Sequence, residues 1–163
     1  MKRNAFLKYA LLAGTVFVAS CENSDAPHKR DTVDFVATLS GGAEVPPNNS
    51  PATGTVAVTY NKANRELQYT INYSGLTSNL VAAHFHVAPP GVNGPVVIPI
   101  TIGPSPITGR VTLTDIRENN SSAIRFRAQD LENFLFAQGM YVNLHTQRFP
   151  GGEIRGDISR KEF

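Results

Sequence analysis

The chain has 163 residues, of which 41% are hydrophobic and 17% are charged, with one cysteine and no tryptophan. This length is sufficient for one domain that buries its own core, and the apolar content excludes a disordered chain. A single cysteine excludes an internal disulfide framework and a zinc module built on several cysteines. The formal net charge of +2 would suit an acidic partner, but it includes residues that we expect to be removed.

The first twenty residues are typical of a secretory signal peptide. Lys2, Arg3 and Lys8 form a positively charged start, and the apolar run that follows is too short to span a bilayer of roughly 30 Å. The run ends in Val-Ala-Ser-Cys at residues 18–21, which resembles the lipobox of bacterial lipoproteins. The sequence therefore predicts a lipoprotein signal peptide over residues 1–20, with Cys21 acylated as the new N-terminus. The alternative is an ordinary signal peptide followed by an incidental cysteine.

Cleavage before Cys21 would leave 143 residues with 12 basic and 13 acidic side chains, because the removed segment holds three of the 15 basic residues and no acidic one. The resulting net charge of −1 gives no reason to expect a nucleic-acid partner or a polybasic membrane patch. Residues 21–31, with His28 among them, are nearly free of apolar side chains and predict a flexible tether. We expect the protein in the bacterial cell envelope, anchored in the outer membrane and facing the periplasm or the surface.

From residue 32 to 163 the sequence predicts one β-domain. Apolar residues recur at every second position, and Gly, Pro and Asn separate the runs, which is typical of short half-buried strands. The expected fold is an all-β, antiparallel, Greek-key-like sandwich of about eight strands. The candidate strands are residues 33–39, 56–60, 67–73, 82–87, 96–102, 109–114, 124–127, 140–146 and 153–159.

One segment, residues 129–138, predicts a short helix instead. Leu131, Phe134 and Leu135 follow helical spacing, and Asp130 lies near the start of the segment. Gly139 comes directly after it, where a left-handed cap favours glycine.

Three histidines of the β-domain form a candidate metal site. His84 and His86 are two residues apart in a predicted strand, so both point to one face. His145 lies in another predicted strand, and if the two strands are neighbours the three imidazoles can converge on copper, zinc or nickel. The alternative is that the histidines make structural hydrogen bonds. Because no convincing nucleophile or general base accompanies them, the sequence does not predict an enzyme.

Two further motifs carry charged side chains beside rigid turns. Pro150 and two glycines predict a tight turn, after which Glu153 and Arg155 share one strand face. Glu44 precedes a Pro-Pro pair that begins at Pro46, so this segment is a loop or a strand end. These charged side chains have two interpretations. They either form ion pairs that stabilise the sheet, including one across to Glu44, or bind a ligand.

Five segments together resemble the CHRD (chordin) domain family: residues 35–47, 83–86, 93–96, 141–146 and 150–156. In animals such domains occur in chordin, an extracellular antagonist of bone morphogenetic proteins, while bacterial relatives are mostly secreted or lipid-anchored. The resemblance implies an extracytoplasmic β-domain and leaves the function open. It also marks six motif residues as structural or ligand-binding: Glu44, Pro46, Asn93, Asn143, Glu153 and Arg155.

A weaker resemblance is to copper-zinc superoxide dismutase, another Greek-key sandwich. His84 and His86 resemble its copper-binding pair, and His145 resembles a further copper ligand. The fourth histidine of the chain, His28, lies in the predicted tether, so none is left in the β-domain for the bridging and zinc positions, and one cysteine cannot form the disulfide. This resemblance therefore implies at most a simpler three-histidine site.

Two functional hypotheses follow. The first is a non-enzymatic, lipid-anchored binding or structural module of the envelope, with an unknown protein or glycan partner. The second is a metal-binding protein that holds copper or zinc on His84, His86 and His145, for metal storage or redox protection.

Overall fold

The computed structural model describes residues 31–117 and 124–162. The predicted signal peptide, Cys21 and all but the last residue of the predicted tether lie outside the described residues. Within the described ranges, no helix combines the length and the hydropathy that crossing a membrane requires. The predicted β-domain begins with its first strand at Thr32.

The described part of the chain is mostly β-structure. Its strands are, in chain order, β1 (Thr32–Ser40), β2 (Thr53–Asn61), β3 (Glu66–Ser74), β4 (Leu80–Val87), β5 (Val96–Pro99), β6 (Ile107–Thr112), β7 (Ile116–Arg117), β8 (Ile124–Phe126), β9 (Met140–Thr146), β10 (Ile154–Asp157) and β11 (Ser159–Arg160). A short 3-10 turn, η1 (Gly41–Ala43), follows β1. One helix, α1 (Ala128–Phe136), precedes β9.

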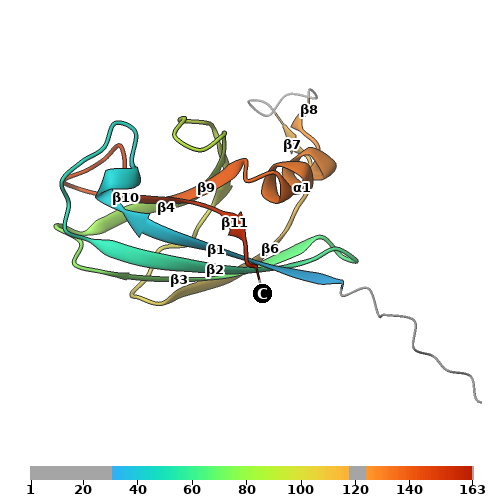
Figure 1. Ribbon diagram of the computed structural model, residues 1–163, viewed down its shortest axis with the longest axis horizontal. Coiled ribbons are helices and arrows are strands. Elements are labelled where there is room, and N and C mark those ends of the chain that lie inside the picture. The colour runs from blue at the N-terminus through green and yellow to red at the C-terminus, as the bar shows by residue number, and fades with distance from the viewer. Residues whose placement is uncertain (1–30, 118–123, 163) are drawn as a thin grey trace, which may run out of the picture.

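Nine strands form one antiparallel sheet in the order β5-β4-β9-β10-β1-β2-β3-β6, and β11 also pairs with β1. Strands β7 and β8 form a separate two-stranded sheet. Figure 1 shows that the large sheet curls, so that β4, β9 and β10 lie over β1, β2, β3 and β6. The predicted antiparallel β-fold with one short helix is confirmed, with both layers belonging to one continuous curled sheet.

The core lies between the two halves of this sheet. In β1 the side chains of Val33, Phe35 and Leu39 are buried and alternate with more exposed positions, as a half-buried strand requires. Tyr69 of β3 packs edge-on against Phe85 of β4, with ring centroids 5.3 Å apart, although four strands separate β3 from β4 in the sheet order. This contact is made because the sheet curls onto itself.

The predicted helix is confirmed, but its cap differs from the prediction. Leu131 and Leu135 are buried, and Asp130 accepts a hydrogen bond from the Arg127 N–H at 3.0 Å. The left-handed residue is Gln138, with φ of 57°, and not Gly139. Position 139 is tightly packed, because a Cβ there would lie 3.0 Å from the Phe134 ring while its N–H bonds the Phe134 carbonyl, so a larger residue would require the ring to shift by a few tenths of an ångström.

The edge strand β5 is shorter than predicted. It ends at Pro99, where the sequence predicted a strand to residue 102. Proline has no N–H to donate to a neighbouring strand, which weakens regular pairing at this edge, and beyond it, among the described residues, only the Ile100 N–H still bonds β4, at the Ala83 carbonyl, 2.9 Å away. The predicted strand 153–159 is also divided: β10 pairs with β9 over Ile154–Asp157, whereas β11 pairs with β1 through Ser159 and Arg160.

Candidate metal centre

The three predicted site histidines lie on two neighbouring strands. Strand β4 pairs with β9, and in this register Ala82 is opposite His145, His84 is opposite Asn143 and His86 is opposite Tyr141. Because side chains alternate along a strand, Phe85 enters the core while both histidines of β4 point to the other face. The condition that the sequence left open, adjacency of the two strands, is therefore met.

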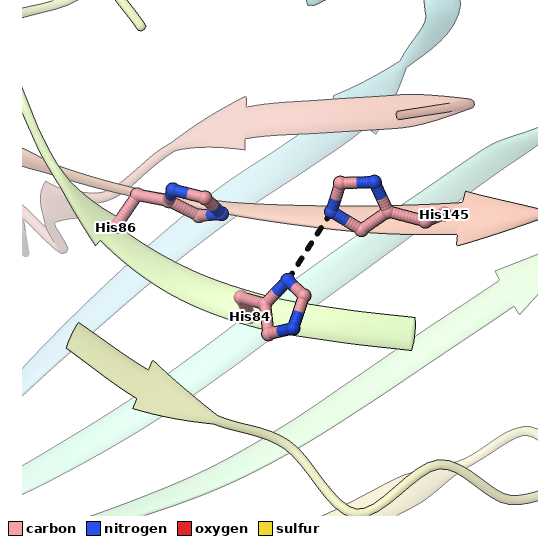
Figure 2. A group of neighbouring side chains, drawn as sticks. All are labelled: His84, His86 and His145. Atoms are coloured by element: carbon pink, nitrogen blue, oxygen red, sulfur yellow. Dashed lines mark hydrogen bonds between the residues drawn. The ribbon is translucent and has the colours of Figure 1, made fainter. Parts of the chain in front are cut away.

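The imidazole nitrogens are close enough to share one ion. One nitrogen of each ring lies within 4.8 Å of the others, and Nδ1 of His84 is 3.2 Å from Nε2 of His145. Figure 2 shows a nitrogen of His86 directed towards the other two rings. Nitrogens bound at roughly 2.0–2.1 Å to a tetrahedral ion lie about 3.3 Å apart. The His84–His145 pair already has this spacing, whereas the nitrogen of His86, within 4.8 Å of the others, would have to approach by up to about 1.5 Å.

Backbone carbonyls orient two of the rings. Nδ1 of His86 donates to the Gly94 carbonyl at 2.9 Å, and Nδ1 of His145 donates to the Pro150 carbonyl at 2.9 Å. Such bonds hold the proton on Nδ1 and place the lone pair on Nε2. In His145 this Nε2 accepts the 3.2 Å hydrogen bond from Nδ1 of His84, so a metal would replace that bond. Nε2 of His86 is buried and has no hydrogen-bond partner among the described residues. A buried polar atom without a partner is the position that an ion or a water would satisfy.

The surroundings keep two of the imidazoles neutral. Burial lowers the pKa of His84, and the neighbouring His145 and His86 lower it further. Burial also lowers the pKa of His86, and this effect outweighs the hydrogen bond to Gly94, which acts in the opposite direction. Neutral imidazole is the form that binds a metal, so at neutral pH both ligands are available without loss of a proton.

The β-strands of the structure and the match to a known protein family cover nearly the same residues. The CHRD domain model matches residues 35–158, more than half of the chain. The chain belongs to the CHRD-domain family. The family membership that the five motifs predicted is thereby confirmed, and the matched range includes all three histidines. Comparison with curated proteins and with solved structures found no significant match.

Arg155 and Asn93, two of the CHRD motif residues, hold the loop that carries Gly94. The Arg155 side chain is only 1% exposed, and its Nη1 donates to Asn93 Oδ1 at 3.2 Å while its Nη2 donates to the Val92 carbonyl at 3.0 Å. Asn93 in turn donates to the Val45 carbonyl at 2.7 Å. These bonds fix the position of the carbonyl that orients His86.

Tyr141 connects Arg155 to the histidines. Its ring stacks on His86 with centroids 4.5 Å apart and planes 8° apart, and the Arg155 guanidinium carbon lies 3.5 Å from the centroid of the same ring. The ion pair of Arg155 is with Asp157 at 3.0 Å, and among the described residues Arg155 has no salt bridge to the predicted partner Glu44. Tyr141 was not among the predicted site residues. The signal that could have found it is period-two alternation in residues 140–146, which places Tyr141 on the same strand face as Asn143 and His145.

Glu44 forms a buried polar pair with Asn143, the residue opposite His84 in β9. Glu44 is 5% exposed, and its Oε1, like Oδ1 of Asn143, is buried without a partner among the described residues. Burial raises the pKa of Glu44 to about 7, although the Arg155 charge and hydrogen bonds from Val45 and Asn143 lower it. The carboxyl packs against Gly152, whose φ of +132° and missing Cβ make glycine necessary there.

The remaining motif residues are structural or line a nearby hollow. Glu153 is fully buried and accepts hydrogen bonds from Ser50, Thr77 and Thr146, so it ties three segments together. Pro46 lines a surface hollow of about 270 Å³ between residues 44–48 and 148–152. The structure therefore brings His84, His86, His145, Asn143 and Arg155 into one neighbourhood and assigns Glu153 to the fold.

Proposed function

We propose that this CHRD-domain protein binds one copper or zinc ion through His84, His86 and His145. The observation that carries the proposal is the convergence of three imidazole nitrogens within 4.8 Å of one another. Copper is expected to bind more tightly than zinc, because nitrogen sites favour copper among the divalent first-row metals. The resemblance of the histidine pair to the copper pair of copper-zinc superoxide dismutase supports the same choice.

The three ligands leave room for an exchangeable fourth ligand on the ion. Two of them, His84 and His145, are half-buried rather than fully enclosed, so metal can enter and leave from that side. This arrangement suits metal storage or redox protection. Binding of a protein or a glycan by the same domain stays a prediction, for which pull-down from envelope extracts is the test.

Metal binding is tested by equilibrium dialysis of the full-length protein against copper and against zinc, with bound metal measured by atomic spectroscopy. We expect about one ion per chain for the wild type. His84→Ala and His145→Ala are each expected to weaken binding by more than about 100-fold, since loss of a ligand exceeds the effect of losing a group that only orients one.

His28→Ala is the matched control, because His28 lies in the predicted tether and its loss should change nothing. Circular dichroism verifies that each variant is folded. A stoichiometry near zero in the wild type would reject the proposal, as would binding that survives both substitutions.

We further propose that an acyl group on Cys21 anchors the domain in the bacterial envelope. The support is the Val-Ala-Ser-Cys sequence at the end of the apolar run, and more than one acyl chain gives stable attachment. Cys21→Ser is expected to leave the precursor unprocessed and unlabelled by a radioactive fatty acid. A variant that is still processed to the same size and stays membrane-bound would contradict this anchor.

A further inference from the structure

We infer that Arg155 biases the three-histidine site towards monovalent copper, with Tyr141 as the spacer between the guanidinium and the metal ligand. This inference rests on the proposed function and specifies the ion that the site prefers. It is carried by the stacking of three buried side chains, Arg155, Tyr141 and His86, and by the absence of charge in the ligand set.

The ligands themselves do not offset the charge of an ion. Within the described residues, the candidate metal group consists of His84, His86 and His145 alone, with no carboxylate or thiolate among them. A bound ion therefore keeps its full formal charge. His86 is 7% exposed, and burial in a medium of low polarity disfavours a doubly charged ion more than a singly charged one.

The strand order places a positive charge behind the buried ligand. Strand β9 lies between β4 and β10, so His86 and Arg155 approach Tyr141 from opposite sides. The ring of Tyr141 is 2% exposed, which leaves no water in the stack to screen the charge. The repulsion between a guanidinium and an ion on His86 scales with the charge of the ion. Cu(II) is therefore penalised about twice as much as Cu(I).

Two acidic groups face the guanidinium and reduce its effect. Asp157 makes the 3.0 Å ion pair, and its side chain is about one-third exposed. Glu44 also faces Arg155, and its carboxyl is partly protonated near neutral pH. Asp157 thus offers a substitution that strengthens the field of Arg155 without removing any side chain from the stack.

The test measures the affinities of the full-length protein for Cu(I) and Cu(II) at one pH, each by competition with a chromophoric chelator, the Cu(I) series without oxygen. Asp157→Asn is expected to raise the ratio of Cu(I) to Cu(II) affinity by roughly threefold or more, and Arg155→Met to lower it by about tenfold. Arg155→Lys keeps the charge and should lower both affinities while leaving the ratio near that of the wild type. Arg110→Met, at an exposed arginine of β6, is the control and should change neither.

If Arg155 only supported the structure, its replacement would lower the affinities for Cu(I) and Cu(II) by the same factor. The ratio of the two affinities therefore separates an electrostatic role from a structural one. Asp157→Asn gives the result even if Arg155→Met fails to fold. An unchanged or lowered ratio in Asp157→Asn would overturn the inference while leaving the proposed metal site standing. Failure of the wild type to bind copper in either state would instead reject the proposed function, and the inference with it.

Discussion

Replacing Glu153 with alanine is expected to lower the free energy of unfolding by about 3–5 kcal/mol. The carboxylate is fully buried and accepts hydrogen bonds from Ser50 Oγ at 2.6 Å, Thr77 N–H at 2.8 Å and Thr146 Oγ1 at 2.6 Å. Truncation leaves these donors without an acceptor and opens a cavity, and each unsatisfied buried donor costs about 1–3 kcal/mol. Urea denaturation monitored by circular dichroism measures the change.

Glu153→Gln is the matched variant, because it keeps the volume and one of the two acceptor oxygens. Its cost should be roughly half that of alanine, since the Thr146 hydroxyl can rotate to meet the new amide. Burial acts to raise the pKa of Glu153, but the hydrogen bonds from Ser50, Thr146 and Thr77 outweigh it and hold the pKa below its ordinary value. Its stabilising effect is therefore present above the ordinary pKa and lost on acidification. A loss of under about 1 kcal/mol in the alanine variant would show that the carboxylate does not hold these segments together.

Glu44→Gln is expected to stabilise the protein at pH 8 and to have little effect near pH 4.5. Burial raises the pKa of the carboxyl from 4.5 to about 7, so the folded state holds the proton more tightly than the unfolded state. Stability from this group is therefore complete below pH 4.5 and is lost as pH rises through 7. At about 1.4 kcal/mol per pKa unit, the loss amounts to roughly 3 kcal/mol. Glutamine carries no charge to bury and escapes this loss.

The measurement is the difference in free energy of unfolding between Glu44→Gln and the wild type from pH 4.5 to pH 8, with a chelator present to exclude metal. Taking the difference cancels the shared titration of the histidines. Glu162→Gln, at an exposed carboxylate near the chain end, is the control. A difference that does not vary with pH would mean that Glu44 is ionised in the folded protein at no cost.

Most of the fold could be predicted from local patterns. Buried and exposed positions alternate in β1, as the spacing of Val33, Phe35 and Leu39 predicted, because a strand places successive side chains on opposite faces. The predicted helix boundaries, 129 and 138, lie within two residues of the observed ones, because helical spacing is also a local pattern. The predicted left-handed cap at Gly139 was wrong, because the positive φ lies at Gln138 and Gly139 is instead packed closely against Phe134.

The candidate site was only partly predictable. The shared face of His84 and His86 follows from their spacing, but the roles of Tyr141 and Asp157 depend on which strands flank β9. The carbonyls of Gly94 and Pro150 that orient His86 and His145 could not be predicted, because any residue type supplies a carbonyl. The structural role of Glu153 could not be predicted either, since the three groups that donate hydrogen bonds to it come from distant segments of the chain.

By itself, the sequence determined that residues 32 onward form a β-domain of the CHRD family and that two histidines share a strand face. The β-domain and the shared face follow from period-two alternation, and the family follows from the resemblance of short motifs; all of these signals are local. Only the tertiary structure decided that His145, 61 residues after His84, lies 3.2 Å from it, and that Arg155 stands behind Tyr141 and His86. Strand pairing brings together residues far apart in the chain, and the pairing partner is chosen by the packing of the whole sheet rather than by any single segment.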